Sequence, residues 1–293
     1  MIKQNFIGHY LSPSGIRITL ADATEAVQKA SEVHQLSPLG ETILGKVMLS
    51  AAMLASDFKN REGVSIKWDT HTALGAIHSD AYESGCIRGF LDHPDAIRDL
   101  MYSEPLEKQY IGDQGDLFVT RYSLLRRPYV SSIHLKTGTV SDCINQYFRE
   151  SDQTLSHTEI QTKFSADGTV LRLSGFIAQL LPGGDRNLFE KVFSSDITYD
   201  LYSENEADPL SLNHLIGSMQ FVLLAGYPLT FQCTCGEDKI KNSLLGLPSC
   251  EKENLLEDPF IEVHCHYCGK TYKISRETLK EWFADKKEEI AHE

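Results

Sequence analysis

Cys233-Thr-Cys235 and Cys265-His-Tyr-Cys268 form two tight cysteine pairs near the C-terminus, with 29 residues between them. They hold four of the seven cysteines in this 293-residue chain. Zinc takes four ligands in a tetrahedron, and two such pairs let two loops each supply two sulfurs at a Zn–S distance of about 2.3 Å. The spacing therefore predicts one four-thiolate Zn²⁺ site, and C-x-C is a rarer first pair than the usual C-x2-C.

Other roles for these cysteines are less favoured. Structural disulfides would suit a secreted chain, but the first residues show no charged region followed by an apolar run and a cleavage site. We expect a cytoplasmic protein, in which thiols stay reduced. His264, His266 and Cys250 lie close enough in sequence to replace a ligand. Two complete pairs already fill the tetrahedron, so we expect none of the three to bind.

The charge distribution argues against nucleic acid and membrane partners. The formal net charge is −13, and residues 232–293 alone carry nine Lys and Arg against 13 Asp and Glu, a net charge of −4. A module that grips nucleic acid needs a basic face to neutralise phosphates. No uncharged apolar stretch reaches the roughly 18 residues that span a bilayer.

The first two-thirds of the chain predicts a mixed α/β core, so the fold class is α+β. A helix should begin after Ser37, with Pro38 in its first position. A second should begin at Thr139 and bury Cys143, while Asp167-Gly168 predicts a hairpin turn. Alternating or apolar runs predict strands at 15–20, 64–68, 85–92, 117–125 and 129–136, with turns at Gly112–Asp116 and Arg127-Pro128. Cys86, inside one of these strands, is assigned to packing.

Residues 179–231 differ in character from the core. They open on the breaker cluster Leu181-Pro-Gly-Gly-Asp185, which we interpret as a hinge, and carry seven acids against two bases. An apolar helix is expected from the spacing of Leu212, Leu215, Ile216, Met219, Val222 and Leu223. The domain prediction is therefore a core at 1–178, a linker with an apolar helix at 179–231, and a zinc-binding domain at 232–293.

Several segments together resemble the bacterial heat shock protein 33 family of redox-regulated 33 kDa chaperonins. Besides the cysteine pairs, they are His34-Gln-Leu-Ser-Pro38, Gly85-Cys-Ile-Arg-Gly-Phe90, Ser151-Asp-Gln153 and Phe176-Ile-Ala-Gln-Leu-Leu-Pro-Gly183. The resemblance spans essentially the whole chain. It implies a cytosolic, ATP-independent holdase that binds unfolded proteins under oxidative stress, with Cys233, Cys235, Cys265 and Cys268 as zinc ligands when reduced.

The resemblance also implies an oxidised state. In it, Cys233 pairs with Cys235, Cys265 pairs with Cys268, and the protein forms a homodimer. The sequence departs from the family pattern at Gly138-Thr-Val140, at Ser151-Asp-Gln153 and at Cys250, a further thiol inside the zinc loop. Cys250 leaves the oxidised pairing open.

A physical mechanism follows from the size of the last domain. About 60 residues with few large apolar side chains cannot build a sufficient core, so the metal must supply much of the fold. Zinc holds the sulfurs as thiolates, the form that oxidants attack. Disulfides within each pair cannot replace the link between the two pairs. Oxidation should then release the metal and unfold the domain. If the domain packs on residues 179–231, its unfolding should also uncover the apolar helix.

The client-binding surface predicted from this mechanism consists of Leu212, Ile216, Met219 and Leu223. Ordinary packing of the same four side chains in every state remains an equal alternative.

Three other functions are less favoured. A constitutive zinc ribbon that binds RNA or a protein partner fits C-x2-C but not C-x-C or the acidic domain. A thiol–disulfide oxidoreductase would place Cys265 and Cys268 at a helix N-terminus, whereas a strand-like Lys270–Ile274 follows them. A hydrolase lacks G-x-S-x-G and H-E-x-x-H, and a zinc bound by four thiolates leaves no position for water. We therefore expect no enzyme.

Overall fold

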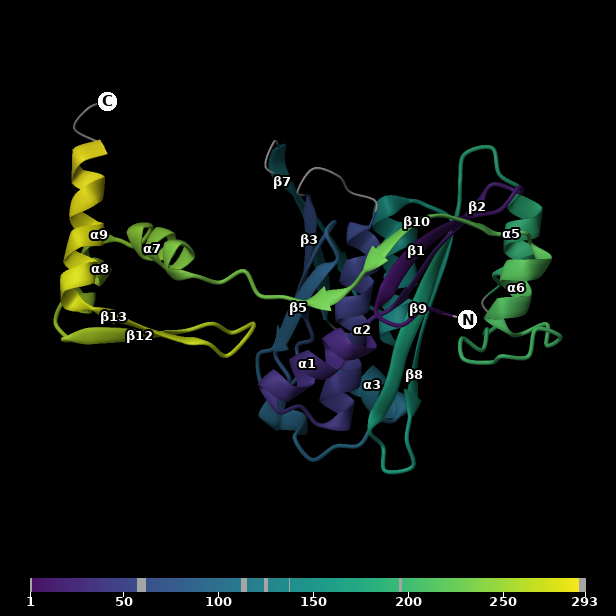
Figure 1. The fold of residues 1–293 in the computed structure, drawn as a ribbon, viewed down its shortest axis with the longest axis horizontal. Helices are drawn as coiled ribbons and strands as arrows, with labels where there is room; N and C mark the ends of the chain where they lie inside the picture. The colour runs from purple at the N-terminus through teal and green to yellow at the C-terminus, as the bar shows by residue number, and fades with distance from the viewer. Residues whose placement is uncertain are drawn as a thin grey trace. The chain divides into compact units, whose positions relative to one another are not determined.

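The computed structural model describes residues 2–56, 62–111, 115–123, 126–136, 138–194 and 197–289. The chain divides into two compact units, Met1–Gln232 and Cys233–Glu293. Both units contain helices and strands (Figure 1). The mixed architecture confirms the α+β class predicted from the sequence.

Two β-sheets form the frame of the first unit. One has five antiparallel strands in the order β10-β1-β2-β9-β8, and the other has six strands in the order β11-β5-β4-β3-β6-β7, in which only β11 runs parallel to its neighbour. The first sheet consists of β1 (Phe6–Leu11), β2 (Ile16–Asp22), β8 (Ser156–Phe164), β9 (Val170–Leu180) and β10 (Val222–Pro228). The second consists of β3 (Gly63–Asp69), β4 (Ala76–Tyr82), β5 (Cys86–Leu91), β6 (Asp116–Ser123), β7 (Arg126–His134) and β11 (Thr230–Phe231).

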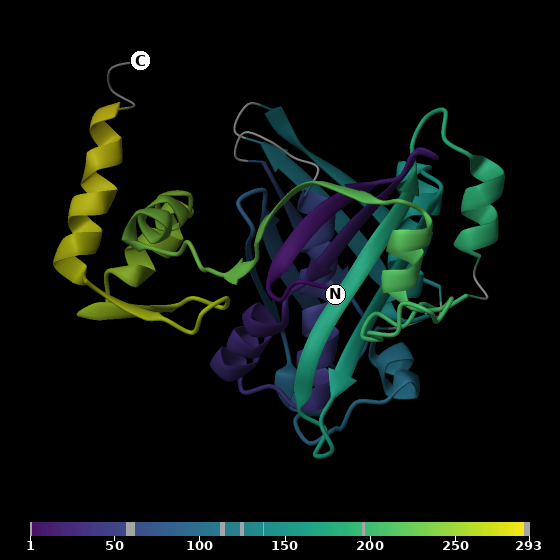
Figure 2. The ribbon, with the colours of Figure 1, turned by 45° about the vertical axis from the view of Figure 1, so that its right-hand side comes forward.

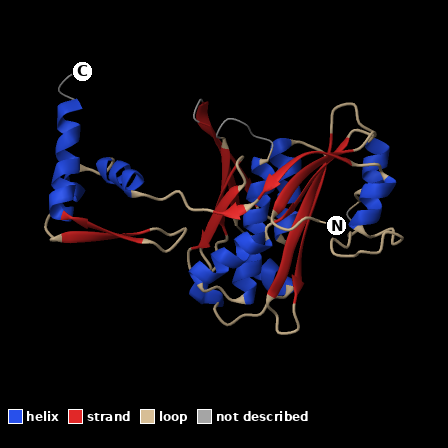
Figure 3. Ribbon diagram, in the orientation of Figure 1, coloured by secondary structure: helices blue, strands red, loops and turns tan. Residues whose placement is uncertain are grey.

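Helix α2 (Pro38–Ala55) lies between the two sheets and contacts strands of both (Figure 3). It begins as predicted, with Pro38 in the first turn and the Ser37 hydroxyl accepting a hydrogen bond from the Gly40 amide at 3.2 Å. By length and composition alone α2 could cross a membrane, but 89% of it is buried inside the protein. Its apolar surface therefore belongs to the core.

The remaining helices of the first unit lie around this frame. They are α1 (Thr24–His34), α3 (Glu104–Ile111), α4 (Val140–Tyr147), α5 (Arg186–Val192) and α6 (Leu212–Ser218), with a 3₁₀ turn at Pro94–Ile97 and a π-helical turn at Phe148–Asp152. Thr139 and Asp142 form a capping box at the start of α4, as the Thr139 prediction requires. Cys143 is buried on this helix, which confirms its predicted position.

The described residues of 186–194 and 197–221 cover the face of the five-stranded sheet that points away from α2 (Figure 2). Ile18 and Leu20 of β2 and Phe176 of β9 point to this face. Phe189, Phe193, Tyr199, Leu201, Leu212, Leu215 and Phe221 pack on them from the covering segment and form a second hydrophobic cluster. We call residues 186–221 the covering segment.

The apolar helix expected through Leu223 is shorter than predicted. Helix α6 ends at Ser218, Gln220 has a φ of +53°, and Val222 begins strand β10, which pairs with β1. The prediction failed because Val222 and Leu223 fit the helical spacing while a β-strand partner far away in the sequence determines their conformation. Strand β10 thus adds the outer strand of the first sheet from within the stretch expected as a linker.

The predicted turns had mixed outcomes. Strands β8 and β9 form the hairpin expected at Asp167-Gly168, and Gly168 has a φ of +86°. Arg127 and Pro128 do not form a turn but lie in β7, the edge strand of the second sheet, where a missing amide can be tolerated. The turn expected at Gly112–Asp116 falls largely on residues outside those described.

The second unit contains two short helices, a two-stranded hairpin and a longer helix. They are α7 (Glu237–Leu245), α8 (Ser249–Leu255), β12 (Phe260–His264), β13 (Thr271–Ser275) and α9 (Arg276–Glu289). Among its described residues only Tyr272, Ile274 and Leu279 are buried apolar side chains. Helices α7 and α8 bury none. This unit therefore has very little hydrophobic core.

Candidate metal centre

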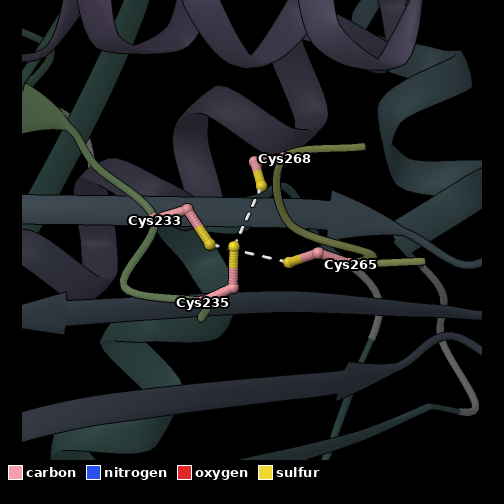
Figure 4. A group of neighbouring side chains, drawn as sticks. All are labelled: Cys233, Cys235, Cys265 and Cys268. Carbon is pink, nitrogen blue, oxygen red and sulfur yellow. Dashed lines mark hydrogen bonds between the residues drawn. The ribbon is translucent and has the colours of Figure 1, made fainter. Parts of the chain in front are cut away.

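The four cysteines of the two predicted pairs converge within the second unit. Their Sγ atoms all lie within 4.8 Å of one another. Cys233 Sγ is 3.6 Å from Cys265 Sγ, and Cys235 Sγ is 3.4 Å from Cys268 Sγ (Figure 4). Each short contact joins one member of each pair. The fold therefore brings together two segments that are far apart in the sequence.

The turn between β12 and β13 positions the second cysteine pair, Cys265 and Cys268. Cys265 follows β12 directly, and its amide donates to the Lys270 carbonyl at 2.9 Å while its carbonyl accepts from the Gly269 amide at 2.8 Å. Gly269 has a φ of +68°, which glycine adopts at little cost. This tight turn between β12 and β13 directs Cys265 and Cys268 to the same side. Cys233 and Cys235 lie on the extended segment before α7.

The sulfur positions fit a tetrahedral metal ion. At a Zn–S distance of about 2.3 Å, tetrahedral geometry places sulfurs about 3.8 Å apart, close to the two short contacts here. A disulfide needs about 2.05 Å, and all four cysteines are free thiols in this structure. The donor set of four soft sulfurs suits zinc among the common ions. The group can therefore hold one metal ion in its reduced form.

The thiols cannot all ionise by themselves. Burial acts to raise the pKa of Cys235, but hydrogen bonds with Tyr272 and with the neighbouring thiols outweigh it and lower the pKa to about 7. Burial, together with the neighbouring thiols, raises the pKa of Cys268 to about 12, and burial raises that of Cys265. Cys235 is therefore the thiol whose pKa favours ionisation, whereas the raised pKa values of Cys265 and Cys268 favour their protonated forms. A divalent cation would remove that restriction.

Tyr272 also contacts the cysteine cluster, and the sequence analysis missed it. Its hydroxyl lies 3.1 Å from Cys235 Sγ, and this hydrogen bond raises the pKa of Tyr272, which keeps the hydroxyl protonated as a donor. A group that hydrogen-bonds a ligand fixes its orientation and tunes the metal. The available signal was a tyrosine in the Lys270–Ile274 strand, four residues after Cys268. Only the register of β13 against β12 shows that it faces the cysteines.

The alternative ligands lie outside the group. His264 Nδ1 is 2.8 Å from Thr271 Oγ1, and Cys250 is an exposed thiol at the start of α8. Among the described residues, the cluster suited to a metal contains the four paired cysteines alone, without His266.

The two other cysteines belong to the first unit. Burial, with the Asp142 and Glu107 carboxylates nearby, raises the pKa of Cys143 to about 12. Cys86 is half-buried on β5, and its Sγ lies 2.8 Å from Gln232 Oε1. Gln232 is the last residue of this unit. Cys86 therefore contacts the segment that leads to the metal centre in the chain.

The four residues predicted to bind clients do not form one exposed surface. Leu212 is buried, and Ile216 and Met219 are partly buried against the second hydrophobic cluster. Leu223 lies on β10 instead and is 48% exposed. Three of the four thus belong to the covering segment and its cluster, and the fourth lies beyond it.

Comparisons with known proteins agree over nearly the whole chain. The family model described as Hsp33 protein matches residues 6–275. A 33 kDa chaperonin of Shouchella clausii (strain KSM-K16) is 27% identical over 271 residues, which cover 90% of this chain and 92% of the relative. A 33 kDa chaperonin of Staphylococcus aureus (strain JH9) is 28% identical over 270 residues, with the same coverage.

A solved structure shows the same fold. The crystal structure of the 33 kDa chaperonin (heat shock protein 33 homolog) from Thermotoga maritima superposes with a TM-score of 0.77 at 24% identity, and the match covers 98% of this chain and 100% of that one. At this identity the likeness concerns the fold.

Proposed function

The chain belongs to the Hsp33 family, and from this premise we propose that it is a redox-regulated, ATP-independent holdase chaperone of the cytoplasm. In the proposed reduced state, Cys233, Cys235, Cys265 and Cys268 hold one Zn²⁺ as thiolates and the protein is inactive. Under oxidative stress the thiolates become disulfides, the ion leaves and the C-terminal module unfolds. The active form then binds unfolded proteins and forms a homodimer.

The observation that carries this proposal is the small core of the second unit. The three buried apolar side chains among its described residues cannot offset the conformational entropy of about 60 ordered residues. Bound structural zinc supplies an apparent 10–16 kcal/mol, about as much as the whole stability of a small domain. Through the bound metal, the four sulfurs link residues near 234 to residues near 267. Loss of the metal would therefore separate the two halves of the module.

The redox step balances with two equivalents of a two-electron oxidant such as hydrogen peroxide. Two S–S bonds form from four thiolates, two O–O bonds break, and four electrons pass to oxygen, which leaves as hydroxide. The pairing Cys233–Cys235 and Cys265–Cys268 is the one we propose. Either disulfide closes only a very small loop and cannot hold the two cysteine pairs together.

The surface that we assign to clients is the apolar face beneath the covering segment. Polar contacts hold this segment at the edge of the sheet. Glu159 Oε2 accepts from the Tyr199 amide at 3.0 Å, while Gln161 Nε2 donates to the Tyr199 carbonyl at 2.6 Å and Gln161 Oε1 accepts from the Leu201 amide at 3.2 Å. If the segment leaves, the side chains of Ile18, Leu20 and Phe176 become accessible.

The order of the elements along the chain would let unfolding spread from the C-terminal module to the covering segment. Strand β11 pairs with β5 through only two residues, and Gln232 N donates to the Ile87 carbonyl at 3.1 Å immediately before Cys233. Fraying that begins at the unfolded module would next reach β11, then β10, and then the covering segment. Leu212, Ile216 and Met219 would become exposed when that segment leaves the sheet. The proposal also divides the chain into a core at 1–178, a linker at 179–231 and a redox switch at 232–293.

The deciding experiment follows zinc content and suppression of aggregation in the same samples during one course of oxidation. We expect the reduced protein to hold one zinc per chain and to suppress aggregation of a urea-unfolded reporter poorly. After hydrogen peroxide at mildly raised temperature, or hypochlorite, zinc should be released and suppression should rise in parallel. Equal suppression in the two redox states would refute the switch. A variant with all four cysteines changed to serine serves as control and should suppress without oxidant.

A further inference from the structure

The first unit contains a cavity that the proposed zinc switch does not use. It has a volume of about 260 Å³ and is bordered by both sheets and by the end of α2. Strands β2 and β9 of the first sheet supply Arg17 and Gln179, strand β6 of the second sheet supplies Arg121, and α2 supplies Met53. The volume is slightly below the roughly 300–1,000 Å³ of sites for drug-sized molecules, so a ligand bound here would be small.

Two of the segments that resemble the Hsp33 family meet at this cavity. Asp152 belongs to the segment 151–153, and five further lining residues belong to the segment 176–183, namely Ile177, Gln179, Leu180, Leu181 and Pro182. Neither segment contributes a residue to the cysteine cluster. The cavity therefore gathers side chains for which the zinc switch provides no role.

Arg17 places a cation on the inward face of β2. Ile16 and Ile18 belong to the second hydrophobic cluster, on the covered face. Because side chains alternate along a strand, Arg17 and Thr19 point to the opposite face, towards α2. Arg17 Nη2 donates to Oε1 of Gln179, its direct neighbour on β9, at 2.5 Å. This partner is a neutral amide, so it leaves the positive charge of the guanidinium uncompensated.

Arg121 approaches the cavity from the second sheet. Its Nη2 donates to Asp152 Oδ2 at 2.5 Å and to Tyr147 Oη at 3.4 Å. Asp152 ends the π-helical turn Phe148–Asp152, and such turns are rare and occur frequently at functional sites. Phe148 of the same turn also lines the cavity. The turn therefore fixes the direction of the Arg121 guanidinium at the cavity wall.

The charge of the lining favours an anion. Among the described lining residues Arg17 and Arg121 are cations and Asp152 is the one anion, which gives a net charge of +1 in a chain of net charge −13. The last carbonyls of α2 add partial negative charge, but the Ser56 hydroxyl donates to the Met53 carbonyl at 2.6 Å. One negative charge on a ligand would balance this lining. Guanidinium groups bind planar carboxylates through paired hydrogen bonds.

The rest of the wall is mainly apolar. Met53, Leu54, Phe148 and Ile177 line the cavity, and each is at most 7% exposed. Hydrocarbon placed against them leaves water, which favours binding. An inorganic anion would make no use of this wall, and an uncharged hydrocarbon would make no use of the arginines. A small anion with a short hydrocarbon body uses both.

We infer that this cavity binds a small organic monocarboxylate, with the carboxylate between Arg17 and Arg121 and the hydrocarbon part against Met53 and Ile177. The inference goes beyond the holdase proposal and does not rest on it, because every described lining residue belongs to the first unit.

The first test uses the full-length, zinc-loaded protein and hexanoate as the probe. Methyl groups of isoleucine, leucine and methionine are labelled with ¹³C, and their NMR shifts are followed during a titration. We expect saturable shifts at Met53, Leu54 and Ile177 with a Kd of about 1 mM, as suits a ligand with so few atoms. Leu210, which is 50% exposed and lies outside the cavity lining, should not shift.

Two further probes separate the two parts of the ligand. Hexan-1-ol has the hydrocarbon without the charge, and inorganic phosphate has charge without the hydrocarbon. Each should bind at least about tenfold more weakly than hexanoate. Equal binding of hexan-1-ol would show a purely apolar cavity, and equal binding of phosphate would show a simple anion site. Either result would overturn the assignment to an organic carboxylate.

A variant tests the role of the arginine. Arg17→Gln removes one cation and keeps the Arg121–Asp152 pair, so hexanoate should bind about tenfold more weakly. Arg17→Lys keeps the charge without the planar fork and should lose less. Arg98→Gln is the matched control, because Arg98 is 65% exposed and pairs with Asp95 outside the cavity. This control should bind hexanoate as the wild type does.

The wild-type titration decides the site even if Arg17→Gln fails to fold. Absence of shifts at Met53 and Ile177, or shifts confined to residues outside the lining, would overturn the inference. A folded Arg17→Gln that binds hexanoate as tightly as the wild type would also overturn it. None of these results bears on the zinc switch, which the oxidation course tests separately.

Discussion

At the level of single residues, the hydrogen bond between Tyr272 and Cys235 leads us to expect that Tyr272 tunes metal affinity. Tyr272→Phe removes only the hydroxyl and keeps the ring, which is buried in the small core of the second unit. Loss of a group that hydrogen-bonds a ligand typically costs 10- to 100-fold in metal affinity. We expect zinc affinity to fall by roughly tenfold, measured by competition with a chromogenic chelator. Tyr129→Phe, in the other unit, should leave the affinity unchanged, and equal affinity for both variants would exclude the role of Tyr272.

The cysteines outside the metal centre should differ sharply in reactivity. Burial raises the pKa of Cys143 to about 12, whereas Cys250 is exposed, and the thiolate is the reactive form. Iodoacetamide at pH 8 should label Cys250 within minutes and leave Cys143 unlabelled until the first unit unfolds. Mass spectrometry of peptides from the zinc-loaded protein gives both rates. Comparable labelling of the two would contradict the buried position of Cys143.

The same raised pKa predicts how stability depends on pH. A cysteine in an unfolded chain ionises near pH 8.5, and Cys143 in the fold ionises at about 12. Because the folded pKa is the higher one, the stabilising contribution is complete below about pH 8.5 and is lost as the pH rises towards 12. Cys143→Ala should therefore reduce the alkaline loss of stability of the first unit, measured as urea midpoints between pH 8 and 10. An unchanged slope would show that other groups dominate.

At the level of elements, a buried ion pair joins α2, α3 and the start of α4. Lys46 Nζ lies 2.6 Å from Glu107 Oε2, and both side chains are almost fully buried. Glu107 also accepts from Tyr102 Oη at 2.8 Å and from the Val140 amide at 3.0 Å, at the first turn of α4. The carboxylate therefore connects three helices, and none of its partners was evident from sequence spacing.

Removing one partner of this pair should be costly. Lys46→Met leaves the Glu107 carboxylate buried without its cation, which typically destabilises a protein by about 3–5 kcal/mol. Urea unfolding of the first unit measures the loss. Lys29→Met is the control, because the Lys29–Glu32 pair is 59% and 67% exposed and should contribute less than about 1 kcal/mol. A loss below 1 kcal/mol for Lys46→Met would mean that Tyr102 and Val140 satisfy Glu107 by themselves.

At the level of the whole molecule, the two units should depend on metal very differently. The first unit has a large core between its sheets and a second cluster under the covering segment, whereas the described part of the second buries three apolar side chains. A strong chelator under reducing conditions should therefore abolish amide protection across residues 237–283 and leave that of α2 unchanged. Hydrogen exchange with mass spectrometry resolves the two regions. Protection that persists in 237–283 would refute metal dependence, and simultaneous loss in α2 would refute the independence of the units.

The sequence was most informative where a pattern is local. Ser37-Pro38, Thr139 and Asp167-Gly168 each predicted a helix start or a turn that the fold contains. Capping and turn preferences act within four residues, so no distant partner is needed. Val222 and Leu223 show the opposite case. Their spacing continued a helix, but pairing with β1, more than 200 residues earlier, made them a strand.

By itself, therefore, the sequence determined the α+β class, the family resemblance and the four cysteines of the metal centre, because ligand type and close spacing are written along the chain. Only the tertiary structure decided that Tyr272 contacts Cys235, that Glu107 joins three helices, and that the described part of the covering segment packs on an apolar face of the first sheet. Each of these depends on which distant segments become neighbours. That choice is made by burial summed over the whole chain, and no local pattern carries it.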